Sequence, residues 1–113
     1  MVQYSQARLD ASFAALSDAT RRGILEQLRR ADASITDLAE KFHMTLTGMK
    51  KHVAILEQAG LVATHKLGRV RTCTLGRERL DAETKWILSY QKSLEARLDR
   101  LGDFLERTKG EDV

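Results

Sequence analysis

The side chains with the most evident binding chemistry are three consecutive cationic or titratable residues, Lys50, Lys51 and His52. Lysine donates hydrogen bonds to guanine O6 and N7 and to phosphate oxygens, so lysines on one helical surface suit a DNA groove. These residues lie within a segment, 34–60, in which a tight turn separates two short helical patterns. That arrangement is typical of a helix-turn-helix, and it predicts sequence-specific DNA binding.

The helix that carries these residues is expected to begin after Thr45, a good N-cap residue, and to end at Gly60, where glycine suits a left-handed C-terminal position. At 100° per residue, one side of this helix is apolar and is predicted to pack inward; it contains Met49, Val53 and Leu56. The opposite side is predicted to face outward and contains Thr47, Lys50, Lys51 and Ala54.

A β-hairpin is expected directly after this helix. Residues 61–67 and 70–75 alternate and are rich in β-branched side chains, and Gly68-Arg69 suits a two-residue turn. A hairpin in this place is the wing of a winged helix, with cations gathered at its tip. The base-reading candidates are Thr47, Lys50 and Lys51, with Leu46 against a thymine methyl. The candidates for phosphate or minor-groove contact are Thr45, His52, Lys66, Arg69 and Arg71.

Three earlier helices are needed to position this unit. The first contains Leu9 and Phe13 at helical spacing and is followed by the capping pair Ser17-Asp18. The second is expected to end near residues 31–32, with an apolar stripe made of Ile24, Leu25 and Leu28. A third, short helix follows, and the spacing of Ser34 and Asp37 resembles a capping box.

The last segment predicts one long amphipathic helix with more apolar surface than a small winged-helix core can cover. We expect this stripe to pair with a second copy of the chain, together with part of the first helix. The expected dimer residues are Leu9, Phe13, Trp86, Ile87, Tyr90, Leu94, Leu98, Leu101 and Leu105. Two alternatives are a stripe packed wholly within the monomer and a ligand pocket floored by Trp86 and Tyr90.

Composition and charge agree with a small nucleic-acid-binding domain. The 113 residues carry a net charge of +3, but residues 41–79 hold eight basic against two acidic side chains, whereas the remainder is net negative. We expect one domain over 9–108, with flexible tails at 1–8 and 109–113. Without an apolar span or a signal-peptide core the chain is expected to be cytoplasmic and away from membranes, and Cys73, the single cysteine, is expected to be a buried apolar group.

Several sequence stretches together resemble the ArsR/SmtB family of small bacterial winged-helix transcriptional regulators. They include Ala15-Leu16-Ser17-Asp18-Ala19-Thr20-Arg21-Arg22, Asp37-Leu38-Ala39-Glu40, Lys51-His52-Val53, Leu56-Glu57-Gln58-Ala59-Gly60-Leu61-Val62 and Gly68-Arg69. The resemblance covers nearly everything from Leu9 to Leu105. It implies a homodimer on an operator with imperfect two-fold symmetry, usually a repressor, with residues 45–52 reading the groove.

The chain departs from the family pattern mainly where metal sensors hold their ligands. The family's thiolate pair would fall on Ser34 and Thr36, which are not soft ligands, and no histidine follows His65 to build the site of the last helix. His43, His52, His65 and Cys73 lack metal-ligand spacing. The chain therefore resembles the non-metal branch, with no metal or cofactor expected and no pattern that identifies an effector.

These observations predict a mainly α fold with a small β-hairpin: a winged helix-turn-helix of about five helices and a two-stranded wing, dimerising through the first and last helices. The predicted function is a sequence-specific DNA-binding regulator, a homodimeric repressor on palindromic, double-stranded operator DNA. The alternative is a winged-helix protein-interaction module without specific DNA binding. An enzyme is not expected, because no nucleophile, base and orienting group occur together and no glycine-rich phosphate loop exists.

Overall fold

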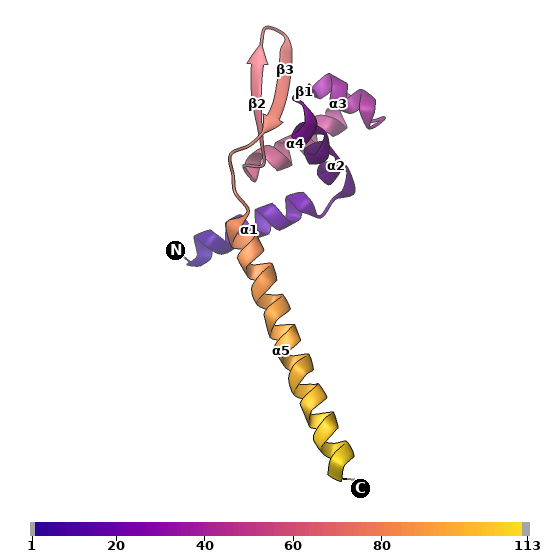
Figure 1. The fold of residues 1–113 in the computed structure, drawn as a ribbon. Coiled ribbons are helices and arrows are strands. Elements are labelled where there is room, and N and C mark those ends of the chain that lie inside the picture. The colour runs from indigo at the N-terminus through magenta and orange to yellow at the C-terminus, as the bar shows by residue number, and fades with distance from the viewer. Residues whose placement is uncertain (1, 112–113) are drawn as a thin grey trace. The chain divides into compact units, whose positions relative to one another are not determined.

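The computed structural model of the protein describes residues 2–111, and in this range the chain forms five α-helices and three β-strands (Figure 1). In chain order these are α1 (Val2–Leu16), α2 (Ala19–Arg30), β1 (Ala33–Ser34), α3 (Ile35–Lys41), α4 (Leu46–Gln58), β2 (Val62–Leu67), β3 (Val70–Leu75) and α5 (Asp81–Glu111). The chain divides into two units, Met1–Arg79 and Leu80–Val113. The first is a winged helix-turn-helix, and the second consists of α5.

The core of the first unit lies where α2, α3, α4 and the sheet meet. Ile24, Met49 and Leu56 are fully buried, and Leu38 and Val53 are nearly so. The predicted inward side of α4 is thereby confirmed. Burying side chains of this size stabilises the fold by roughly 1.5–3 kcal/mol each, so the apolar side of α4 is held firmly and its polar side is left outward.

Three polar side chains cap the helices as the sequence predicts. The Asp18 carboxylate accepts a hydrogen bond from the Arg21 backbone N–H at 3.0 Å, the Ser34 hydroxyl from Asp37 at 3.0 Å, and the Thr45 hydroxyl from Gly48 at 3.0 Å. Each cap satisfies a donor that the first turn of a helix leaves unpaired. The starts of α2, α3 and α4 are therefore set by side chains that lie close to them in the sequence.

The sheet contains one strand more than the sequence predicts. β2 and β3 form the expected antiparallel hairpin, but the short strand β1 also pairs with β3, with Ala33 opposite Cys73 and Ser34 opposite Thr72. A two-residue strand is too short to show the period of two that identifies strands in a sequence. The extra strand anchors the base of the wing to the segment that enters α3.

Two connections use backbone conformations that few residues tolerate. His43, in the turn between α3 and α4, has φ 54°, and Gly60, at the end of α4, has φ 77°. Gly60 also lies against the end of the wing, where a Cβ on Gly76 would stand 2.0 Å from the Gly60 carbonyl oxygen. The path from α4 into the hairpin therefore requires glycine at both positions.

The helices at the two ends are longer than the sequence predicts. α1 begins at Val2, so residues 2–8, expected as a flexible tail, belong to this helix. No glycine or proline interrupts this stretch, and the sequence therefore contains no stop signal for the helix. α5 continues through residues 109–111 of the other expected tail, and residues 112–113 lie outside the described range. None of the helices in the described range is long and apolar enough to cross a membrane.

Cys73 lies on β3 and is fully buried, as expected. Burial, reinforced by the negative charge of Glu57, raises the pKa of the thiol to about 11, with Arg71 opposing the shift. Because the thiolate is the reactive form, we predict that the folded protein resists alkylation by iodoacetamide at pH 8. Mass spectrometry should find the thiol unmodified under native conditions and modified in guanidinium chloride; rapid modification of the folded protein would contradict this prediction.

Candidate DNA-binding surface

The exposed side of α4 carries all four residues expected to contact bases. Thr47, Lys50 and Lys51 are exposed, as is Thr45 at the N-cap, and Leu46 is 44% exposed. Their positions follow from the opposite side of the helix, where Met49, Val53 and Leu56 are buried. The helix therefore presents amines, hydroxyls and one apolar side chain at its N-terminal end.

The wing presents a second set of cations. Lys66 on β2 stands directly opposite Arg71 on β3, and Arg69 lies in the turn beside Gly68, whose φ is 62°. All three cationic side chains are exposed. Figure 1 shows the β2–β3 hairpin extending beyond the helices of its unit, so its tip is accessible to a partner.

A groove of about 730 Å³ joins the two sets of cations. Leu46 and Lys50 line it from α4, and Lys66, Arg69 and Arg71 line it from the wing. No described acidic side chain forms an ion pair with any of these four cations. Five of the nine residues proposed for DNA contact are thereby brought to one groove, where four cations outnumber the single carboxylate of Asp37, so the groove attracts a polyanion.

Other groove residues were not anticipated as part of the site. The start of α3 forms one wall through Ser34, Ile35, Thr36 and Asp37, and Val70 lies on the wing side at 53% exposure. The pairing of β1 with β3 brings this wall beside the wing, and no local pattern in the sequence indicates it. Ser34 and Thr36 line the groove with hydroxyls.

His52 occupies a different environment from the other proposed DNA contacts. Its side chain is 21% exposed, its Nδ1 lies 3.2 Å from Nη1 of Arg21, and Asp18 Oδ2 is 3.9 Å from the same nitrogen. The backbone N–H of Arg21, which donates to the Asp18 carboxylate, lowers the pKa of Asp18 below its ordinary value. His52 thus lies at a polar junction with α2 and not in the groove.

The expected dimer residues of α5 form an exposed apolar surface. The seven of them on this helix are between 41% and 60% exposed, and Trp86 and Tyr90 stack with ring centroids 5.8 Å apart. Leu88 and Phe104 are exposed as well and were not anticipated. On α1, Leu9 and Phe13 are half-buried.

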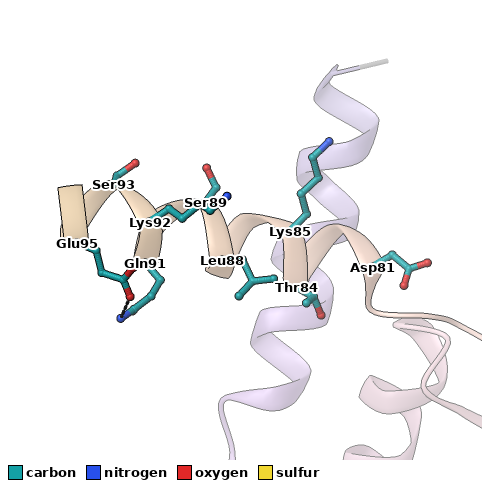
Figure 2. A pocket seen from close by; sticks show the side chains of 9 residues that line it. All are labelled: Asp81, Thr84, Lys85, Leu88, Ser89, Gln91, Lys92, Ser93 and Glu95. Carbon is teal, nitrogen blue, oxygen red and sulfur yellow. Dashed lines mark hydrogen bonds between the residues drawn. The ribbon is translucent and has the colours of Figure 1, made fainter. Parts of the chain in front are cut away.

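The N-terminal half of α5 also carries a shallow hollow, and Figure 2 shows the nine side chains that line it. All nine belong to α5, and eight are polar, with a Gln91 to Glu95 hydrogen bond of 3.5 Å among them. Side chains of one helix diverge from its axis, so these residues do not build the concave, mostly apolar walls typical of ligand sites. Among the described residues no three histidine, cysteine or acidic side chains are grouped to hold a metal ion.

The chain is similar to known helix-turn-helix proteins. Residues 16–65 match the model of a helix-turn-helix domain. The transcriptional repressor SdpR of Bacillus subtilis is 33% identical over 78 residues, which cover 69% of this chain and 87% of SdpR.

Solved structures agree over most of the chain. The crystal structure of an ArsR family transcriptional regulator is 40% identical with a TM-score of 0.72, and the match covers 80% of this chain and 93% of that one. An ArsR-like transcriptional regulator from Rhodococcus sp. RHA1 is 31% identical with a TM-score of 0.76, and the match covers 94% of this chain and 97% of that one. The likeness therefore extends beyond the helix-turn-helix itself.

Proposed function

Because the chain belongs to the ArsR family of DNA-binding transcriptional regulators and is not an enzyme, we propose that it represses transcription as a homodimer on a palindromic operator. Each copy places the start of α4 in the major groove and the β2–β3 wing on the flanking backbone or minor groove. The observation that carries this proposal is the groove between α4 and the wing, with its four cations that lack described acidic partners.

Residues of the site divide by what they contact. Thr47, Lys50 and Lys51 project from the exposed side of α4 near its start, where the recognition helix of a helix-turn-helix approaches base edges. Leu46 is exposed enough to meet a thymine methyl. Thr45 and the wing cations Lys66, Arg69 and Arg71 supply phosphate or minor-groove contacts, which fix register without reading sequence.

The apolar seam of α5 supports pairing with a second copy. Leu94, Leu98, Leu101 and Leu105 follow one another at spacings of four, three and four, which is the repeat of a coiled-coil seam. Each is between 41% and 57% exposed within the chain. In the dimer, the two recognition helices would lie about one turn of DNA apart, roughly 34 Å, and so meet successive major grooves.

The relative SdpR is a transcriptional repressor, and repression by this chain would follow from occupancy of the promoter. The test begins by selecting bound sequences from a random pool of duplex DNA. Footprinting on the selected site should show protection of two half-sites about one helical turn apart. Protection of a single half-site, or a selection that yields no preferred sequence, would contradict the proposal.

The wing is tested separately with Arg69→Ala. We expect this variant to bind the selected site and scrambled DNA less tightly by a similar factor, and the slope of log affinity against log salt to fall by about 1 per protomer. Fluorescence anisotropy at several salt concentrations measures both quantities. The exposed Arg97 of α5 gives a matched control, since Arg97→Ala removes the same charge outside the groove. An Arg69→Ala protein with unchanged affinity and slope would exclude the wing from the DNA contact.

A further inference from the structure

Arg21 of α2 donates hydrogen bonds to backbone carbonyls at the C-terminal end of α1. The Arg21 side chain donates from Nε to the Ala15 carbonyl and from Nη2 to the Ala14 carbonyl, both at 2.9 Å. The next residue, Arg22, donates from Nη1 to the Leu16 carbonyl at 2.7 Å. The last carbonyls of a helix have no partner within it, so these bonds hold the C-terminus of α1 against the start of α2.

The same guanidinium also reaches α4. Its remaining nitrogen, Nη1, lies 3.2 Å from Nδ1 of His52. A guanidinium has only donors, so this contact is a hydrogen bond only when Nδ1 of the imidazole carries a lone pair. The neutral ring, with its proton on Nε2, therefore accepts from Arg21.

Protonation of the His52 ring removes the acceptor from this hydrogen bond. A cationic imidazole has an N–H on both nitrogens, so Nδ1 would direct a donor at the donor of Arg21. The other charged group at this position is Asp18, whose Oδ2 lies 3.9 Å from Nδ1 and already accepts from the Arg21 backbone. Both facing charges come from α2 and its N-cap, and together they draw a cationic ring away from the guanidinium.

His52 is placed so that this change acts on the DNA-binding side chains. It is half-buried on α4, and its neighbours in the sequence are the exposed Lys51 and the buried Val53. The ring therefore acts together with the buried side of α4 to set the rotation of the helix about its own axis, and with it the direction of Lys50 and Lys51. Base readout requires those directions to be held within a fraction of an ångström and about 10–20°.

We infer that Arg21 and neutral His52 form a positioning pair, which holds α4 in the orientation that discriminates between DNA sequences and which protonation of His52 replaces with a contact to Asp18. This inference rests on the proposed role of α4 in reading bases. It assigns His52 to positioning instead of phosphate contact, and it makes sequence discrimination depend on pH.

The test measures the ratio of affinities for the selected site and for scrambled DNA at pH 8.0 and pH 5.5. In the unmodified protein the ratio should fall about tenfold on acidification, the effect of losing one hydrogen bond to a charged group. In His52→Asn the amide oxygen can accept from Arg21 and does not titrate, so the ratio should not change with pH. A constant ratio in the unmodified protein, or the same fall in His52→Asn, would overturn the inference.

A phosphate contact by His52 gives a different result. Acidification would then strengthen binding to both DNAs alike and leave the ratio constant, which also overturns the inference. Arg21→Lys, which loses the fork of donors, should show at pH 8.0 the low ratio of the acidified protein with an unchanged salt slope, because all three guanidinium nitrogens of Arg21 bond within the protein. Circular dichroism checks that each variant is folded. Failure of the proposed function is distinguishable, since the unmodified protein would then show no preference at pH 8.0.

Discussion

Replacing Leu94 and Leu98 together with glutamate should convert the proposed homodimer into a monomer and weaken binding to the selected DNA on the order of 100-fold or more. Both side chains belong to the α5 seam and are 41% and 56% exposed within the chain. Two glutamates on each helix would place four negative charges in an apolar interface, where unpaired charges are strongly unfavourable. A monomer engages one half-site alone and loses the gain from tethering two binding units, which is typically 10²- to 10⁴-fold.

Sedimentation velocity measures the mass, and anisotropy with the selected DNA measures the affinity. The matched control is Ser93→Glu with Ala96→Glu, which adds the same charge at exposed positions of α5 that lie outside the seam. The control should sediment as a dimer and bind as the unmodified protein does. A Leu94→Glu, Leu98→Glu protein that still sediments as a dimer would exclude this seam from the interface.

The helices and the wing are predictable from the sequence because their signals are local. Asp18, Ser34 and Thr45 cap their helices by accepting from a backbone N–H three residues later, a spacing visible in the sequence. The alternation of residues 61–67 and 70–75 predicts the two strands, and the two-residue turn between them predicts the observed register, with Leu67 opposite Val70. Features that depend on neighbours within about four residues are therefore recovered.

Features that depend on contacts between residues distant in the sequence are not predicted by local sequence patterns. β1 exists because Ala33 and Ser34 pair with Cys73 and Thr72, about forty residues later. On the helical wheel His52 lies between the lysines and the core, so its side-chain chemistry and its position predicted a phosphate contact. Its actual neighbours, Arg21 and Asp18, belong to α2 and its N-cap, and no pattern within α4 indicates them.

The reason for a glycine at position 48 is also found in the structure and not in the sequence. A glycine in the first turn of a helix costs about 1 kcal/mol relative to alanine, and the sequence offers no reason for it. In the structure, a Cβ at this position would stand 3.1 Å from the Thr45 hydroxyl oxygen and 3.3 Å from the Met44 methyl. The Thr45 hydroxyl accepts from the Gly48 N–H, so glycine leaves room for the cap that starts the recognition helix.

Lys50→Ala should relax the sequence preference of the protein, with a loss of about 1–3 kcal/mol of binding free energy per half-site on the selected DNA. Lys50 is exposed on α4 and lines the groove beside the wing cations, without a described acidic partner. A lysine that donates to guanine O6 or N7 gains this energy only at the matching base pair. The affinity ratio between the selected site and scrambled DNA should therefore fall, whereas Arg69→Ala should leave that ratio nearly constant.

The position of the lost preference is the sharpest readout for Lys50. Selection from a random pool with the Lys50→Ala protein should yield sites that keep every preferred base pair except one or two adjacent pairs in each half-site, because one side chain reaches one or two base edges. Lys92→Ala, on the exposed surface of α5, removes the same charge away from the groove and should select the unmodified site. If Lys50→Ala also selects the unmodified site and loses affinity equally for all DNA, Lys50 binds phosphate, and base readout falls to Thr47 and Lys51.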